Sequence, residues 1–380
     1  MFTLRMFDLV IINGNVNFGD LSKSSKCNIG ITGEKISYIG DEKISGKEFI
    51  DAEGFEVTPG FIDLHTHSDL SFIVDPEADS KLIQGVTFEL MGNCGMSFCA
   101  PLSKDNKYQL QERLNRYGIR KEMDWNNFDD WLTEIENNMP SINVAAQIGH
   151  GNLRSYVMGM EARQANPDEL NKMKDEIQKA CDQGVLGFST GLWYAPGSYS
   201  SAEEIIELAK IANRNNILYS SHIRSESDDS SGLFPAHAEA IEIARRSGVR
   251  VQISHVKSVG PKFWGRGYEL IEGIEKARNE GLDVAGDQYP YFWSSTPISG
   301  CMFPRWSLEG GREKTLLRMK DSDIREKIKN ETTNFINRFH GAQGCVLADY
   351  PEDTNLEGLN LTEISKIKNT TPEESVMQLY

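Results

Sequence analysis

The 380-residue chain lacks long hydrophobic runs and an N-terminal leader pattern. No stretch approaches the roughly 20 consecutive apolar residues of a membrane-spanning helix. The opening residues, MFTLRMFDLVIINGNV, alternate in polarity and include Asp8, which is not the order of a secretory signal. We therefore expect a cytoplasmic protein that does not associate with membranes.

A surplus of basic residues is also missing. The chain has 40 Lys and Arg against 56 Asp and Glu, a net charge of −16, and we find no concentrated basic patch. A chain this acidic is a poor candidate for binding nucleic acid or an anionic membrane. The sequence carries no signal of oligomeric state.

The chain is also poor in cysteine. The six cysteines lie far apart in a chain large enough to bury its own core. We expect free thiols in a reducing compartment, any of which could be a metal ligand rather than a disulfide partner. These are Cys27, Cys94, Cys99, Cys181, Cys301 and Cys345.

Three regions differ in pattern. Residues 1–56 contain the short alternating runs DLVIING, CNIGITG, KISYIG and KEFIDAEG, which predict a small β domain. Residues 57–300 repeat an apolar strand, a polar strand end and an amphipathic helix. Residues 301–380 are looser, with charged helices such as DSDIREKIKNETTNFINRF, and we expect no barrel strand there.

The repeating region predicts parallel βα units, either an α/β barrel or a doubly wound sheet. We expect helix starts at Asn166-Pro167 and at Ser201, where Glu204 has the spacing of a capping box. The seven expected strands are GFIDLHTH, GVTFELMGNCG, INVAAQIGHG, VLGFSTGL, ILYSSHIRSE, VRVQISHVKS and LDVAGDQYPY. Because a closed barrel needs eight, we expect the last strand to be missing from this chain.

Several of these strands end in side chains that bind metals. His65 and His67 flank Thr66, and alternate residues of a strand point the same way, so both imidazoles can converge on one ion. The alternative is two polar residues that only cap a strand. Cys94, His222 and His255 end other strands; each alone would be an ordinary buried residue. Together they favour a zinc site.

The remaining histidines carry weaker expectations. His150 ends the third strand and is a loose candidate for the neighbourhood of the site, whereas we expect His237 and His340 at the surface. The spacing between Cys94 and Cys99 is not that of a structural zinc site, and we assign Cys99 no role.

These motifs together resemble one family. DLVIINGNV, TPGFIDLHTHSD, MGNCG, GHGNLR, GFSTGLWYAPG, SSHIRSE, ISHVKSVG and DQYPY follow the order seen in the N-acyl-D-amino-acid deacylases (D-aminoacylases) of the metal-dependent amidohydrolase superfamily. The resemblance runs to about Thr296. It implies a TIM-like (β/α)8 metallo-hydrolase barrel, a small β-sandwich domain at the N-terminus, and an insertion or lid in residues 301–380.

The resemblance also implies a set of roles. Zn²⁺ would be bound tightly by Cys94, His222 and His255, and a second, weaker site would use His65 and His67 with the Cys94 thiolate between them. Lys257, Tyr289 and Ser295 match positions that hold the substrate carboxylate or lie beside the reacting amide. An ordinary solvated lysine and a tyrosine packed beside Pro290 are the alternatives for the first two.

One expected group has no match. The family's final barrel strand carries a general acid/base Asp in a Ser-Asp-Gly-like motif, followed by an Arg that grips the substrate carboxylate. This chain has no such motif, and Asp349 is a poor substitute, so we assign no catalytic residue and expect both groups beyond Tyr380.

The expected reaction is zinc-dependent hydrolysis of N-acyl-D-amino acids. Related cyclic amidases, the hydantoinases and dihydroorotases, bridge their metals with a carboxylated lysine, and the fourth strand here, VLGFSTGL, has none. A cyclic amidase, a deaminase, or a catalytically silent metal-binding chain remain as alternatives. The D preference rests on the resemblance, and the sequence does not specify the substrate side chain.

Overall fold

The computed structural model describes residues 6–20, 22–99, 101–120, 122–123, 125–229 and 231–380. The first five residues of the segment inspected for a leader lie outside this part. The chain divides into two compact units, Met1–Ile62 with Ile83–Thr87, and Asp63–Leu82 with Phe88–Tyr380. Each is described separately.

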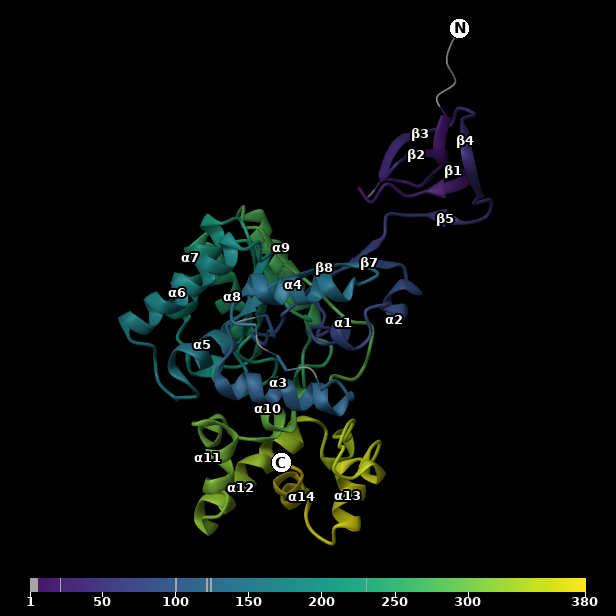
Figure 1. Cartoon of the computed structure of the whole chain (residues 1–380). Helices are drawn as coiled ribbons and strands as arrows, with labels where there is room; N and C mark the ends of the chain where they lie inside the picture. The colour runs from purple at the N-terminus through teal and green to yellow at the C-terminus, as the bar shows by residue number, and fades with distance from the viewer. Residues whose placement is uncertain (1–5, 21, 100, 121, 124, 230) are drawn as a thin grey trace. The chain divides into compact units, whose positions relative to one another are not determined.

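The N-terminal unit contains one mixed sheet of five short strands (Figure 1). The strand order is β3-β2-β1-β4, with β5 paired to β1; β1 and β2 are antiparallel, whereas β1 and β4 are parallel. Phe7 packs directly over Gly30, where an added Cβ would lie 2.7 Å from the ring. The strands are β1 (Met6–Val16), β2 (Ser25–Thr32), β3 (Lys35–Gly40), β4 (Ser45–Asp51) and β5 (Glu56–Val57).

A second sheet has seven strands that follow chain order, from β6 to β12, and β8 to β12 lie wholly in the larger unit. Neighbouring strands pair in parallel from β7 to β12. Each strand falls within one of the seven runs expected from the sequence. They are β6 (Phe61–Asp63), β7 (Val86–Met91), β8 (Asn143–Gly149), β9 (Gly187–Gly191), β10 (Leu218–His222), β11 (Val251–Ile253) and β12 (Val284–Gly286).

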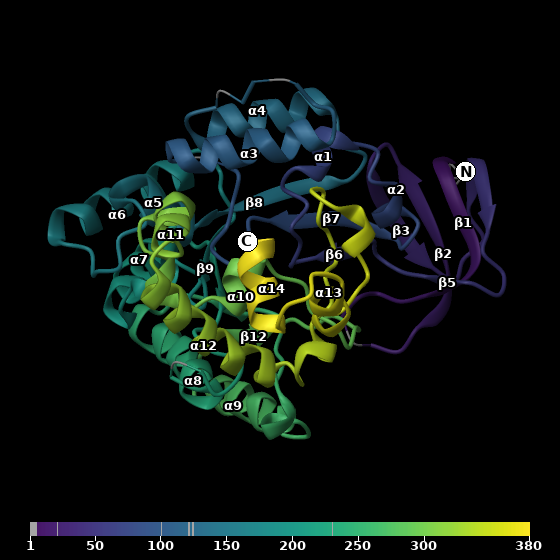
Figure 2. The ribbon, with the colours of Figure 1, turned by 90° about the horizontal axis from the view of Figure 1, so that it is seen from below.

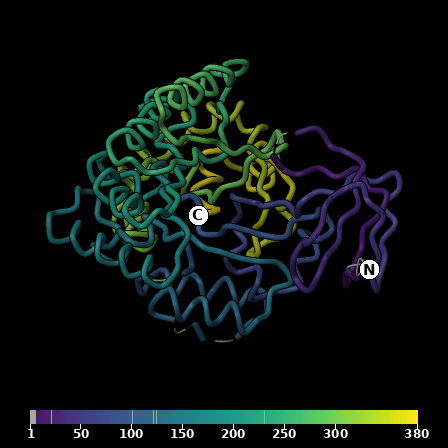
Figure 3. Tube along the Cα trace, turned by 90° about the horizontal axis from the view of Figure 1, so that it is seen from above, coloured from purple at the N-terminus to yellow at the C-terminus, as the bar shows by residue number. Residues whose placement is uncertain are grey.

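Helices connect these strands, and α6 to α9 pack one after another (Figures 2 and 3). This βα order confirms the TIM-like α/β fold. In the described residues β12 pairs only with β11, and its Ala285 and Gly286 are exposed. The helices are α1 (Ser71–Val74), α2 (Asp79–Leu82), α3 (Lys104–Arg116), α4 (Phe128–Asn138), α5 (His150–Met158), α6 (Pro167–Asp182), α7 (Ala202–Arg214), α8 (Leu233–Ser247) and α9 (Gly267–Asn279), with the 3₁₀ turns η1 (Gly197–Tyr199) and η2 (Pro261–Phe263).

Helix caps show one departure from expectation. Asn166 caps α6 in a complete capping box with Glu169, as its sequence predicts. Ser201 caps α7, but the expected box with Glu204 does not form. The Glu204 carboxylate instead contacts His150 and Arg154 of α5, because those buried donors offer a charge-assisted bond in place of one backbone N–H.

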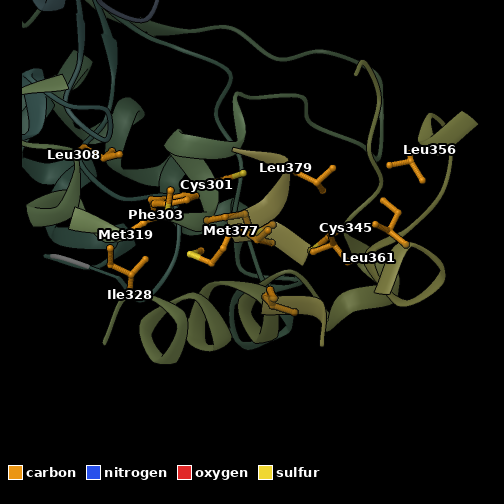
Figure 4. Packing of buried hydrophobic residues seen from close by; sticks show 14 of the residues in the cluster. Cys301, Phe303, Leu308, Met319, Ile328, Cys345, Leu356, Leu361, Met377 and Leu379 are labelled. Carbon is orange, nitrogen blue, oxygen red and sulfur yellow. The ribbon is translucent and has the colours of Figure 1, made fainter. Parts of the chain in front are cut away.

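The last 80 residues form a helical region around a buried apolar cluster (Figures 1 and 4). Phe303, Ile328 and Ile364 lie at its centre and are fully buried. The region contains α10 (Ile298–Met302), η3 (Arg305–Leu308), α11 (Gly311–Arg318), α12 (Ser322–Arg338), η4 (Ala342–Gly344), η5 (Thr354–Leu356), α13 (Leu361–Ile367) and α14 (Pro372–Leu379). Near Asp349 the structure has an isolated bridge, Val346 to Asn360, and the Asp349 side chain is exposed.

No helix in the described residues is both long enough and apolar enough to cross a membrane.

Candidate metal centre

Two histidines follow the first strand of the larger unit. β6 ends at Asp63, whose Oδ1 accepts a hydrogen bond from the His65 backbone N–H at 3.1 Å. The rings of His65 and His67 lie 5.6 Å apart between centroids. The end of β6 thus brings the His65 and His67 imidazoles together beside Cys94.

Cys94 follows the second strand in a tight turn. Its φ is +55°, in the left-handed region, and it lies between Gly92 and Gly95. The turn presses against the end of β9, because a Cβ on Gly191 would lie 2.0 Å from the Cys94 carbonyl oxygen. Cys94 Sγ lies 3.4 Å from His65 Nε2 and 3.5 Å from His255 Nε2.

The other two histidines come from the fifth and sixth strands of this sheet. His222 is the last residue of β10, and His255 follows β11 by two residues. Their ring centroids are 4.5 Å apart and both residues are buried. His255 also has a positive φ of 37°, and strained backbone of this kind clusters at functional sites.

The five side chains form two groups that share one sulfur. His65, His67 and Cys94 make one, and Cys94, His222 and His255 make the other. Within each group the possible ligand atoms lie within 4.8 Å of one another. Thiolate and imidazole donors at this spacing fit Zn²⁺.

The protonation states agree with a metal site. Burial lowers the pKa of His222 well below its usual value, so the ring is neutral, the form that binds metals. Burial raises the pKa of the Cys94 thiol. A bound metal cation would lower this pKa and give the thiolate. Both ring nitrogens of His222 are buried without a hydrogen-bond partner in the described residues. The donor set therefore fits the expected metal.

Two carboxylates of the centre were not foreseen. Asp287 Oδ1 lies 3.0 Å from His65 Nδ1 and accepts the His255 backbone N–H at 2.6 Å. Glu226 Oε1 lies 3.0 Å from His255 Nδ1 and 2.6 Å from Lys257 Nζ. Both lie within motifs already quoted, DQYPY and SSHIRSE. Asp287 could have been found from its place directly after a strand, as the histidines were.

Burial acts to raise the pKa of both carboxyls, but their partners outweigh it. The positive charge of Lys257 holds the pKa of Glu226 far below its usual value. The hydrogen bond with His65 lowers the pKa of Asp287. Both groups are thus carboxylates, and each lies 3.0 Å from the Nδ1 of a candidate ligand, the place of a partner that orients a metal-binding imidazole.

The three expected substrate contacts differ in position. Lys257 Nζ lies 2.8 Å from His255 Nδ1, at the edge of the cluster. The Tyr289 ring lies 6.4 Å from that of His255 and 5.6 Å from Lys257 Nζ. Ser295 is exposed, in the loop between β12 and α10.

The remaining candidates lie outside the two groups. His150 is fully buried and paired with Glu204 at 2.8 Å. His237, expected at the surface, is buried in α8, because it packs where Gly273 of α9 leaves room. His340 is exposed, and Cys99 is buried with its thiol donating to the Gln147 carbonyl. All six cysteines are free.

Comparison with known proteins finds relatives in one family. Residues 48–219 match the amidohydrolase family. The chain is similar to an N-acyl-D-glutamate deacylase of Alcaligenes xylosoxydans xylosoxydans, 37% identical over 76% of this chain and 58% of the relative. A D-aminoacylase of the same organism is 33% identical over 77% of this chain and 59% of the relative. The chain thus spans about three fifths of the length of these curated relatives.

A solved structure extends the likeness to the fold. The N-acyl-D-glutamate deacylase of Bordetella bronchiseptica, complexed with zinc and a phosphonate inhibitor, matches with a TM-score of 0.80 at 28% identity. The match covers 99% of this chain and 70% of that one. The fold and these relatives agree, and the chain belongs to the D-aminoacylase family of the metal-dependent amidohydrolases.

Proposed function

We propose that this chain belongs to an enzyme that hydrolyses the amide bond of N-acyl-D-amino acids with the help of zinc. The observation that carries the proposal is the pair of ligand groups sharing Cys94. The relatives named for D-glutamate deacylation and D-aminoacylase activity support the substrate class.

In this proposal Cys94, His222 and His255 hold the tighter ion, and His65 and His67 complete a second, weaker site with the same sulfur. When bound, zinc lowers the pKa of a water molecule toward about 7 and polarises the acyl carbonyl. Asp287 and Glu226 keep His65 and His255 in orientation, which their 3.0 Å contacts support. Cys94, His222 and His255 are buried, whereas His67 is exposed, so the second site lies nearer to solvent.

We assign substrate binding to Lys257, Tyr289 and Ser295. The partly buried Lys257 ammonium beside His255 supports a role in attracting the substrate carboxylate. The Tyr289 ring lies next to Lys257 and would lie beside the reacting amide. No position of these 380 residues matches the acid/base Asp that the family resemblance predicts, and we leave that role unassigned.

The finer features of the fold belong to the same proposal. We propose that an eighth strand closes the barrel beside β12, where a hollow runs between that strand and Ile271 and Ile274 of α9. The N-terminal sheet would be one layer of a β-sandwich; Phe49, 55% exposed on β4, supports an apolar face that a second layer would cover. We retain the division at residues 56 and 300, with residues 301–380 as an insertion or lid.

We further propose a cytoplasmic location, which the six free thiols support. The partner would be a small-molecule N-acyl amino acid, with neither nucleic acid nor membrane involved.

The test is an assay of the purified zinc-loaded protein on matched substrates. N-acetyl-D-glutamate, N-acetyl-D-aspartate and N-acetyl-D-methionine should release the free amino acid, and their L enantiomers should react far more slowly. Hydantoin and dihydroorotate serve as controls for a cyclic amidase. Turnover of the cyclic amides alone would contradict the proposal, and zinc binding without any hydrolysis would favour the silent metal-binding alternative.

A further inference from the structure

The imidazoles of the candidate ligands are held in two different ways. His65 and His255 each have a carboxylate oxygen 3.0 Å from Nδ1. Neither ring nitrogen of His222 has such a partner in the described residues, and Glu226 Oε1 remains 3.9 Å from its Nε2. Because a metal-ligating histidine almost always bonds through its second nitrogen, some other contact must fix the plane of His222.

Aromatic rings surround His222 instead. The Trp193 ring is stacked on it, with centroids 5.9 Å apart and planes at 10°. Tyr194 lies 4.7 Å away at 57°, and the His255 ring meets it edge-on at 4.5 Å. Parallel stacking on one side and an edge contact on another restrict rotation of the imidazole about its Cβ–Cγ bond.

Trp193 is in turn held by the helical region. Its Nε1–H donates to Asp229 Oδ2 at 2.7 Å, and the Arg305 guanidinium lies 5.0 Å above its ring. Asp229 also pairs with Arg305 at 3.5 Å and with Arg338 at 3.6 Å. Arg305 is in η3 and Arg338 ends α12.

The apolar contacts of Trp193 point to the same region. Trp193 is 8% exposed and belongs to the buried cluster of the helical region. Figure 4 shows Phe303 and Leu308 of the same cluster. One indole therefore joins the core of residues 301–380 to a candidate zinc ligand.

We propose that Trp193 is a positioning residue for His222, stacking in place of the missing hydrogen bond, and that Arg305 and Asp229 hold the indole for this purpose. The inference rests on the proposed metal centre. It gives the helical region a role in metal affinity.

Zinc affinity in the absence of substrate is the measurement, by competition with a chelator. Trp193→Leu removes the ring, and we expect its zinc dissociation constant to rise by about 10–100-fold, the usual effect of losing an outer-shell partner. Trp193→Phe keeps an aromatic ring and should stay within about threefold of the wild type. The d–d absorption of the cobalt-substituted protein should change in the leucine variant and be restored in the phenylalanine variant.

Trp131→Leu is the matched control. Trp131 is also a buried indole, packed on Phe128 of α4 at 5.5 Å, and its loss should lower stability without changing zinc affinity. Equal weakening of zinc binding in Trp131→Leu and Trp193→Leu would overturn the inference, since general loosening would then explain both.

A second pair of variants tests whether Asp229 holds the Trp193 indole. This test does not depend on the folding of Trp193→Leu. Asp229→Ala removes the acceptor of the indole N–H, and we expect several-fold weaker zinc binding. Asp228→Ala removes a neighbouring carboxylate that also pairs with Arg338, at 3.3 Å, and should leave zinc affinity unchanged.

The outcomes separate this inference from the proposed function. Unchanged affinity in both Trp193→Leu and Asp229→Ala overturns the positioning role and leaves the metal centre intact. A wild-type chain that does not bind zinc overturns both.

Discussion

Cys94 is the residue on which the two ligand groups depend. It is the only member common to both, and its Sγ lies within 3.5 Å of a histidine from each. Its backbone is held in the left-handed region by a turn that packs against Gly191. A thiolate here would neutralise part of the charge of either ion.

We predict that Cys94→Ala weakens zinc binding by more than the roughly 100-fold that outer-shell changes cost, because it removes a ligand outright. Metal content after dialysis against a chelator measures this. Cys99→Ala is the control: Cys99 is equally buried, but its thiol donates to the Gln147 carbonyl instead. Full zinc occupancy in Cys94→Ala would remove this residue from the site.

Among individual residues, the sequence indicated the five candidate ligands but neither of the carboxylates that orient them. Histidine and cysteine are rare enough for their placement at strand ends to be informative. Asp287 and Glu226 are two of 56 acidic residues, and only their contacts with His65 and His255 distinguish them.

Helices α5 and α7 are joined by a buried charged network. Arg154 donates to both oxygens of Glu204, at 2.7 and 2.5 Å, and His150 Nε2 lies 2.8 Å from Oε1. Arg154 and His150 are fully buried. The network lies under the β9–α7 connection, since His150 Nδ1 is close to the position that a Cβ on Gly197 would occupy, 3.6 Å away.

We predict that Glu204→Gln lowers the free energy of unfolding by about 3 kcal/mol, because it leaves the Arg154 charge buried and uncompensated. Urea denaturation measures the change. The neighbouring Glu203→Gln is the control: Glu203 pairs with Arg246 at an exposed position, where solvent screens the pair, and its loss should cost far less than that of Glu204. Equal losses in the two variants would contradict a buried network.

The same network predicts lower stability in acid. Burial lowers the pKa of His150 from its usual 6.5. Below pH 6.5 the unfolded chain therefore binds a proton at His150 that the folded chain does not, and the free energy of unfolding falls; above pH 6.5 this loss is absent. Burial opposes ionisation of Glu204, but His150 and Arg154 together hold its pKa below the usual 4.5. Its contribution is present above pH 4.5 and is lost at still lower pH.

We therefore expect the free energy of unfolding to fall steadily as the pH is lowered from 7 to 4, measured by urea denaturation at each pH. Glu204→Gln should show a shallower decline below pH 4.5. His340→Asn changes an exposed histidine and should leave the profile unaltered. A flat wild-type profile would contradict the lowered pKa of His150.

Across the larger unit, the sheet and the helical region form one compact body. The buried cluster of residues 301–380 includes Trp193 from the loop after β9, so the two parts share a core. The helical region is therefore part of the folded framework around the candidate centre.

We predict that Phe303→Ala lowers the free energy of unfolding by about 3–5 kcal/mol, the usual cost of emptying a buried aromatic site. It should also weaken zinc binding, because the cluster supports Trp193. Phe292→Ala is the control, since Phe292 is fully exposed, and it should change neither quantity. Two separate unfolding transitions, with only one affected, would argue against a shared core.

What the sequence alone specified was local: the strands and helices, most caps, and the side chains that end the strands. Hydrophobic periodicity and capping are short-range signals, and parallel strands bring their carboxyl ends together whatever lies between them. This is why His65, Cys94 and His255 could be grouped without coordinates.

What required the three-dimensional fold was the choice among competing partners. Glu204 has the spacing of a capping box, yet it pairs with Arg154 and His150, which become neighbours only when α5 packs beside α7. Trp193 reads as one more apolar residue until the fold stacks it on His222. Contacts between residues distant in sequence depend on packing, and no local pattern encodes them.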